Sequence, residues 1–268
     1  MTIADFEIEK IENLSFLDIE KRFNENKKQP YYKKLLEYYF DYNKLNDLQN
    51  FRTFPNYFKK IKLNWILAYE KKQNSNVLAG HAIMCKINYH NQNDLPENGW
   101  SGSTVKSFND EGQKKDMNTY VGLFVHIEKN FREKNISKLL IEEMKNQAKK
   151  ENKKLIIPLR PPTRFTSDYC TMKFSDYAKL KDKDGYHIDF WVRIHMKFGA
   201  KYLGFCDTSH QHKMDVKSFK KFFGKFSFSE TGYYVVKILG GSHNVHYDKL
   251  EELITINQGC IWVEHYPH

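Results

Sequence analysis

The chain lacks the features that direct a protein into a membrane or out of the cell. No apolar run approaches the roughly 18 residues that a membrane-spanning helix requires. The N-terminal sequence MTIADFEIEK is acidic and has neither a basic start nor an apolar centre, so it does not resemble a secretory signal. We therefore expect a cytoplasmic protein with no membrane partner.

Cysteine is scarce, and its spacing matches no redox or metal motif. The four cysteines are Cys85, Cys170, Cys206 and Cys260. None forms a CxxC pair and all lie in apolar runs, which predicts free buried thiols in a reducing compartment. Possible metal ligands near the C-terminus are His243, His246, Glu264, His265 and His268. Their spacing fits no standard zinc pattern, so we expect no metal site.

The chain also lacks a basic stripe with interleaved aromatic residues, which argues against nucleic-acid binding. Its formal net charge of +10 comes from lysine-rich segments that alternate with acids. A phosphate-bearing small ligand fits this distribution, and so does a composition bias without functional meaning. Hydrophobic residues make up 40% of the chain, enough for a packed core and too many for a disordered protein.

The segment 119–162 predicts a strand, a loop, a helix and a second strand. Residues 120–127 (YVGLFVHI) are almost all apolar or β-prone, which is typical of a strand buried on both faces. After the loop EKNFREKN, apolar residues recur at helical spacing over 136–148, and 155–158 (LIIP) predict the next strand. Such a loop can hold an anion, because the first amides of a helix lack partners and the dipole adds positive charge.

The N-terminal residues 1–55 predict a helical extension packed on the core. Phe16, Ile19 and Phe23 repeat at helical spacing, and the tyrosine-rich stretch 31–42 is amphipathic. An aromatic stripe of this kind is more often part of a core than a binding surface.

Further elements are expected on both sides of the central segment. Residues 63–70 and 77–89 predict a β-hairpin around the polar turn KKQNSN. Residues 91–118 are interpreted as a polar insertion that contains LPENGWSG. Towards the C-terminus, 189–198 predict a helix ended by a glycine, and 201–206 a further strand.

The loop after the central strand resembles motif A of the GNAT superfamily of N-acyltransferases. There a strand ends in Val-x-Pro-x-x-Arg-Gly-x-Gly-Ile-Gly, a long helix follows, and the loop amides bind the pyrophosphate of acyl-coenzyme A. The matching positions here are Ile127, Lys129, Arg132, Lys134, Ile136 and Ser137. The two loop glycines are replaced by Glu133 and Asn135. Asn tolerates a positive φ better than most residues, whereas Glu133 puts an acid beside the expected pyrophosphate.

Spaced motifs elsewhere resemble a bacterial GNAT subfamily often found near secondary-metabolite genes. That subfamily has Leu-Pro-x-Gly-Gly-Trp, Arg-Pro, Asp-Gly-x-x-x-Asp-x-Trp-x-Arg-x-His-x-x-x-Gly, Gly-x-Tyr-x-Val and x-Val-Trp-x-x-His, in this order. The chain has 95–100 (LPENGW), 160–161 (RP), Asp184, Gly185, Asp189, Trp191, Arg193, His195, Gly199, 232–235 (GYYV) and 261–265 (IWVEH). The resemblance covers about residues 50–268.

The resemblance implies an α/β fold of GNAT type. Its sheet is mixed but mostly antiparallel, with a V-shaped splay between the central strands and helices on its flanks. Residues 56–268 would form the acyltransferase domain with C-terminal strands, in one globular unit with the 1–55 extension. Acetyl-CoA or another acyl-CoA would bind with its thioester along Val125, His126 and Ile127, and its pyrophosphate on the loop from Arg132 to Ser137.

The resemblance also suggests two catalytic histidines. His195 takes the place of the family's catalytic tyrosine, which implies that it protonates the departing thiolate, since imidazole donates a proton near neutral pH. Alternatively, it is a helix histidine that bonds a carboxylate such as Asp189. His126, at the end of the central strand, is the candidate base for the amine. The alternative for His126 is a histidine packed in the core.

The candidates for binding the acceptor are Trp100, Tyr186, Asp189 and Arg193. Arg193 can bind a substrate carboxylate with two hydrogen bonds, or simply pair with Asp189 at i,i+4. Trp100 and Tyr186 can wall an acceptor pocket or pack in the core.

Three functions are consistent with these features. The first is an N-acyltransferase that moves an acetyl or other acyl group from acyl-CoA or acyl-pantetheine to the amine of a small molecule. The second is a catalytically idle GNAT-like protein that binds a ligand or partner, which the acid at Glu133 favours. The third takes its acyl group from an acyl carrier protein, whose phosphopantetheine arm lacks the pyrophosphate and needs no loop glycines.

Overall fold

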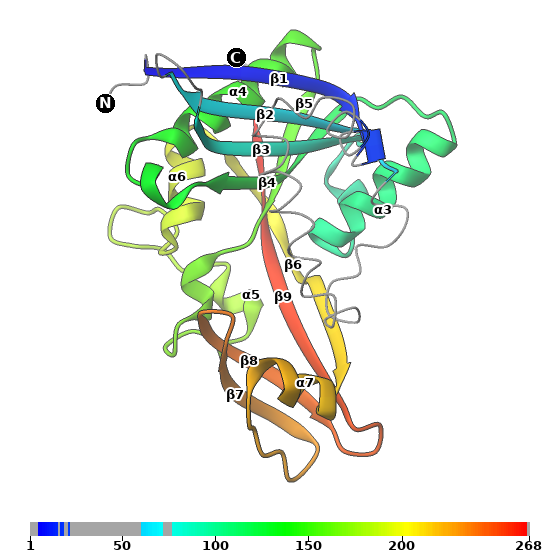
Figure 1. The fold of residues 1–268 in the computed structure, drawn as a ribbon, viewed down its shortest axis with the longest axis vertical. Helices are drawn as coiled ribbons and strands as arrows, with labels where there is room; N and C mark the ends of the chain where they lie inside the picture. The colour runs from blue at the N-terminus through cyan, green and yellow to red at the C-terminus, as the bar shows by residue number, and fades with distance from the viewer. Residues whose placement is uncertain (1–4, 16, 19–20, 22–59, 72–76, 267–268) are drawn as a thin grey trace.

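The computed structural model describes residues 5–15, 17–18, 21, 60–71 and 77–266. These residues form a nine-stranded sheet with the strand order β1-β2-β3-β4-β5-β9-β8-β7, and β6 pairs with the second edge of β9 (Figure 1). Neighbouring strands are antiparallel except for the parallel pair β4–β5. This mixed, mostly antiparallel sheet with flanking helices confirms the predicted fold class.

The first half of the sheet consists of β1 (Phe6–Leu14), β2 (Leu63–Glu70), β3 (Val77–Ile87) and β4 (Thr119–Ile127). Strands β2 and β3 form the predicted hairpin. Every residue of β2 is buried, so its backbone groups need a strand on each edge. Strand β1 supplies one of them. The helix predicted over 1–55 is therefore wrong for residues 6–14, and most of the remaining extension lies outside the described residues.

Strands β4 and β5 (Lys154–Leu159) are joined by helix α4 (Ile136–Lys150), as the sequence predicts. The buried side of α4 carries Ile136, Leu140 and Met144, and its last turn is basic. Only residues 119–121 pair with 154–156. Beyond these three pairs the two strands separate, which produces the predicted V-shaped splay (Figure 1).

The second half of the sheet consists of β6 (Lys201–Asp215), β7 (Gly232–Ile238), β8 (Gly241–Asp248) and β9 (Leu253–His265). One edge of β9 pairs with β6 along most of its length. The other edge pairs with β8 through residues 253–256 and with β5 through 261–265. In Figure 1, β6 and β9 run down the molecule towards the β7–β8 hairpin, far from β1.

Helices cover both faces of the sheet. On one face, α4 and the predicted helix α6 (Phe190–Lys197) pack on a shared apolar cluster. On the opposite face, α3 (Gly99–Gly112) lies against β3 and β6. The interpretation of 91–118 as an insertion missed this helix. Its buried side consists largely of small polar residues such as Ser103, Thr104 and Ser107, so the apolar periodicity that marks a helix is absent.

Shorter elements complete the described fold: η4 (Gln92–Asp94), η5 (Lys129–Phe131), η6 (Pro162–Phe165), α5 (Phe174–Tyr177) and α7 (Val216–Phe223). Helix α7 packs on the β7–β8 hairpin through the fully buried Phe219, in an apolar cluster of its own. In the described part of the chain, no helix combines the length and the apolar character that crossing a bilayer demands.

Candidate active site

The gap between β4 and β5 begins at a β-bulge. The register between β3 and β4 skips Leu123, which is therefore an extra residue in β4. Its backbone oxygen accepts a hydrogen bond from the indole nitrogen of Trp100 at 3.0 Å. At the adjoining Gly122, an added Cβ would lie only 3.0 Å from the side chain of Ile157 in β5. Glycine thus lets the strands approach here, and the bulge then bends β4 away from β5.

Past the bulge, one edge of β4 is open. After Val121, the edge that faces away from β3 has no strand partner among the described residues. Val125 and Ile127 pack on the cluster beneath α4, whereas Phe124 packs on the cluster of the opposite face. Residues 124–127 are only half-buried. The backbone groups along this edge can therefore hydrogen-bond an extended ligand.

The loop that follows β4 has a glycine-like backbone although it contains no glycine. Glu133 has φ 65° and Asn135 has φ 59°, which are left-handed conformations. Both stand at positions where motif A has glycine. Asn135 is also the N-cap of α4, so the first amides of the helix open beside this turn. The loop conformation suits an anion, while the side chain at Glu133 brings strain and negative charge.

Positive side chains surround the start of α4. Lys134 lies over the ring of Phe131 at 4.8 Å, and Lys138 lies over the ring of Phe198 at 5.5 Å. Lys138 also faces Glu142 at 4.0 Å. Arg132 is exposed and forms no ion pair with another described residue. The local charge and the helix dipole therefore favour the same kind of ligand, an anion.

His126 lies beside a second histidine that sequence reasoning missed. His81 of β3 pairs with His126 in register, and the ring centroids are 5.4 Å apart. Burial, followed by the nearby His126, lowers the pKa of His81 to about 3. The His126 side chain is 24% exposed, and its Nε2 lies 3.9 Å from Glu128. Strand alternation puts both rings on the face opposite α4 and α6.

His195 lies on the buried side of α6 and is fully buried, and its partner comes from the end of β9. Its Nδ1 is 2.9 Å from Nε2 of His265, so this partner is His265 rather than Asp189. Burial, then His265, lowers the pKa of His195 well below its usual value. Burial, then Lys145, lowers the pKa of His265 to about 4. Both rings are therefore neutral at pH 7.

Each ring of this histidine pair has one nitrogen, here called the outer nitrogen, that takes no part in the shared hydrogen bond. His195 Nε2 and His265 Nδ1 are buried and have no hydrogen-bond partner among the described residues. In a neutral pair, one ring donates and the other accepts. If His265 Nε2–H donates, His195 carries its proton on the outer Nε2. Buried polar groups without a partner are uncommon and call for an explanation.

Asp189, predicted to bind substrate, caps α6. One carboxylate oxygen accepts hydrogen bonds from the amides of Trp191 and Val192 at 2.9 and 3.1 Å. The other accepts from the amide of Thr163 at 2.7 Å and lies 3.4 Å from the Tyr177 hydroxyl. The side chain is fully buried. Asp189 therefore fixes the start of α6 to η6.

Arg193 pairs with Asp182, not with Asp189 as one sequence interpretation suggested. Its Nη1 is 3.2 Å from Oδ2 of Asp182, and both side chains are partly exposed. Asp182 also accepts from the amide of Tyr186 at 3.0 Å. Arg193 and Tyr186 are thus brought together beside α6, on the His195 side of the sheet. Trp100 and His126 lie on the opposite face.

The C-terminal histidines that the structure describes, His243, His246 and His265, each have a different neighbour. His243 stacks on Phe165 at 4.6 Å, His246 contacts Tyr233, and His265 bonds His195. His268 lies outside the described residues. Across the described ranges, no group of three or more His, Cys, Asp or Glu is arranged to hold a metal. All four cysteines are free, as the sequence predicts; Cys85, Cys170 and Cys260 are buried as expected, whereas Cys206 is half-buried.

Three buried histidines should make the protein sensitive to mild acid. Burial is the largest cause that lowers the pKa of His81 to about 3 and those of His243 and His265 to about 4. In the unfolded chain the pKa of histidine is about 6.5, so the unfolded state binds more protons between pH 4 and 6.5. The free energy of unfolding should therefore fall as pH is lowered through this range.

Urea denaturation at several pH values between 4 and 7.5 measures this dependence. The variant His265→Gln should show a weaker pH dependence, since glutamine does not titrate. A free energy of unfolding that stays constant from pH 6.5 to 4.5 would contradict the expectation.

No protein-family model matches the chain, and no curated protein is similar to it at a significant level. Among solved structures, it is similar to the crystal structure of the loading GNATL domain of CurA from Lyngbya majuscula. The TM-score is 0.44 with 12% sequence identity, over 74% of this chain and 85% of that chain. The roles of individual residues therefore rest on the geometry of this protein.

Proposed function

We propose that the protein is an acyltransferase that moves an acetyl or other acyl group from acyl-coenzyme A to the amine of a small molecule. One observation carries this proposal: the open edge of β4, created by the bulge at Leu123, leads directly into the left-handed loop at the start of α4. An extended pantetheine arm can hydrogen-bond the open edge, and its phosphates can meet the helix amides.

The parts of this site have distinct roles in the proposal. The main chain from Val125 to Ile127 holds the thioester and polarises its carbonyl, as a fixed donor does in an oxyanion hole. The amides of Ile136 and Ser137 bind the pyrophosphate, together with the side chains of Arg132 and Lys134. Because the main-chain amides are already fixed by α4, aligning them on the ligand costs little conformational entropy.

In the proposal, His126 and His195 act on opposite faces of the sheet. His126 is partly exposed on one face and takes the proton of the attacking amine. The C–N bond forms, the C–S bond breaks, and the thiolate leaves on the other face. There the neutral His195 donates a hydrogen bond from Nε2–H to the sulfur, with His265 holding its orientation. The thiolate gains its proton from water, since the low pKa of His195 leaves little imidazolium at pH 7. Arg193 and Tyr186 contact the acyl donor on the face of the sheet where His195 lies. Trp100 supports β4 through its hydrogen bond to Leu123.

Isothermal titration calorimetry with acetyl-CoA, a longer acyl-CoA and phosphopantetheine tests the proposal. We expect binding of at least one thioester in the micromolar to millimolar range. Turnover with a panel of small amines, followed by release of free thiol, then tests transfer. If no thioester binds at millimolar concentration, the site does not have this function. Binding without turnover on any amine would favour an idle ligand-binding protein.

Replacing Glu133 with glycine should tighten coenzyme A binding. The substitution removes a carboxylate, and the side chain that carries it, from beside the expected pyrophosphate. Relief of the left-handed conformation, which costs about 1–2 kcal/mol for a non-glycine residue and is already present in this structure, should raise stability instead. We expect the dissociation constant, measured by calorimetry, to fall by about tenfold, which corresponds to ~1.4 kcal/mol.

Two controls separate the causes. Glu133→Gln removes the charge but keeps the side chain. Glu252→Gly relieves a left-handed residue with φ 48° in the distant turn before β9, and should raise stability without changing affinity. Unchanged or weaker coenzyme A binding in Glu133→Gly would mean that this loop does not hold the pyrophosphate.

Glu133 also favours a second candidate, transfer from an acyl carrier protein. A phosphopantetheine arm on a carrier has one phosphodiester and no pyrophosphate, so an acid in the loop is less costly. In that case phosphopantetheine should bind as tightly as coenzyme A, and Glu133→Gly should change the affinity of coenzyme A alone.

A further inference from the structure

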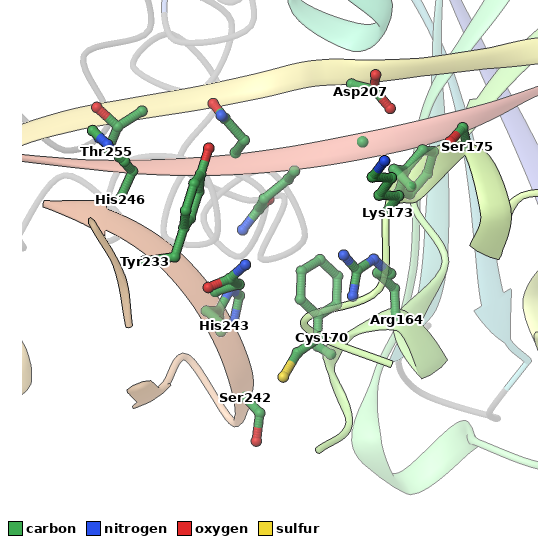
Figure 2. A pocket seen from close by; sticks show the side chains of 16 residues that line it. Arg164, Cys170, Lys173, Ser175, Asp207, Tyr233, Ser242, His243, His246 and Thr255 are labelled. Atoms are coloured by element: carbon green, nitrogen blue, oxygen red, sulfur yellow. The ribbon is translucent and has the colours of Figure 1, made fainter. Parts of the chain in front are cut away.

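A pocket of about 300 Å³ lies where β8 diverges from β9. Only residues 245–248 of β8 pair with β9, and β9 meets β5 again only at 261. The segment from η6 to α5 closes the space between them (Figure 2). None of its lining residues belongs to β4, α4 or the loop between them. The pocket is therefore a cavity distinct from the proposed thioester site.

The η6–α5 segment packs closely against β8 and β9 at the pocket. An added Cβ on Gly241 would lie 2.8 Å from the backbone oxygen of Phe165, and one on Gly259 would lie 2.8 Å from the ring of Phe174. Phe165 also stacks on the ring of His243 at 4.6 Å. Larger residues at the two glycines would push the η6–α5 segment off the strands. The walls of the pocket are thus closely packed, while its mouth opens to solvent beside exposed residues such as Lys173 and Asp207.

About half of the lining is polar, and its charged side chains carry excess positive charge. Figure 2 shows Arg164 and Lys173 entering from the η6–α5 side, with Asp207 beyond Lys173 and His243 on the β8 side. With His243 neutral because of its low pKa of about 4, two cations face one carboxylate. The amide and hydroxyl side chains that β8 and β9 contribute to the lining are Ser242, Asn244, Thr255, Asn257 and Gln258.

Among these residues, Arg164 gives the strongest indication of an anionic ligand. Its Nη2 donates to the backbone oxygen of Met172 at 2.6 Å, and its guanidinium lies 5.7 Å from the ring centroid of Tyr177. Its Nη1 is buried and has no hydrogen-bond partner among the described residues. In the described part of the chain, Arg164 also has no carboxylate partner. A half-buried guanidinium whose Nη1 has no acceptor and whose charge has no counter-ion is unfavourable until an anion reaches it.

We propose that this pocket binds a small polar molecule through a carboxylate or phosphate group. Arg164 holds the anionic group with its free Nη1, and Lys173 adds a second positive charge. The amides and hydroxyls on β8 and β9 bind the polar remainder of the molecule. This site is additional to the proposed acyltransferase chemistry and does not depend on it.

Calorimetry at low ionic strength, with inorganic phosphate and with succinate as probes, tests the site and distinguishes the two anions. We expect at least one probe to bind the wild-type protein at millimolar concentration. Arg164→Gln should weaken that binding by about tenfold or more, and Lys173→Gln by roughly threefold. Lys179→Gln is the matched control, because Lys179 is exposed on the same segment but does not line the pocket. It should leave the affinity unchanged.

Further variants keep the test independent of folding and of the thioester site. Lys173 is exposed, so Lys173→Gln should fold even if Arg164→Gln does not. Arg132→Gln reports phosphate that binds at α4 instead. Acetyl-CoA affinity should be unchanged in Lys173→Gln and in Arg164→Gln. The proposal is overturned if neither probe binds, or if Arg132→Gln weakens binding while both pocket variants do not.

Discussion

Replacing His195 with alanine is expected to lower turnover by about a hundredfold, the usual size for a group that acts on the reacting atoms. The affinity for acyl-CoA should change little, because the ring is proposed to interact with the sulfur mainly as negative charge develops. Single-turnover rate and melting temperature should be measured on the same preparation. A stable His195→Ala protein with wild-type turnover would end this assignment.

Two conservative variants separate hydrogen bonding from packing. His195→Gln keeps an N–H donor near the position of Nε2, so it should retain more activity than alanine. His265→Gln keeps a donor towards Nδ1 of His195, so it should also retain more activity than His195→Ala. A purely structural pair would behave differently. All three variants would then lose stability, while turnover per folded molecule would stay at the wild-type value.

Replacing Asp189 with alanine is expected to lower the free energy of unfolding by about 3 kcal/mol. An N-cap contributes ~1 kcal/mol, and each further buried amide that loses its acceptor costs about 1–3 kcal/mol. For a chain of this size the melting temperature should fall by roughly 10 °C, measured by calorimetric scanning. A residue that mainly binds substrate would behave otherwise: the variant would keep its stability and its KM for the amine would rise.

Asp215→Ala provides a matched control for this variant. Asp215 is the N-cap of α7 and accepts from the Ser218 amide at 2.8 Å, but it is exposed. Water can satisfy the helix amides when its side chain is removed, so the loss should be only about 1 kcal/mol. Equal losses in the two variants would contradict a special role for the buried carboxylate of Asp189.

Strong local patterns made the centre of the fold predictable from the sequence. The apolar run at 120–127 and the helical periodicity after Ile136 correctly gave β4 and α4, because each element buries its own apolar side chains. The positive φ at Glu133 and Asn135 agrees with the positions matched to glycine, although a charged residue gives no such signal by itself.

Elements whose character depends on distant partners were missed. Residues 6–14 form a strand because the fully buried β2 offers them an edge, which their own sequence does not reveal. The pairing of His195 with His265 joins residues 70 positions apart, and no local rule connects them. Arg193 had a suitable carboxylate at Asp189 in sequence, but Asp189 was already committed to capping the helix.

The three residue pairs between β4 and β5 are a short seam between two larger plates of the sheet, β1–β4 and β5–β9. Each plate has extensive strand pairing of its own, whereas the seam contributes few hydrogen bonds. Helices α3 and α4 pack across the seam, so side-chain packing on the two faces of the sheet, and not strand pairing, holds the two plates at their angle. An extended molecule hydrogen-bonded along the open edge of β4 would add backbone pairing to the part of the sheet that has least of it.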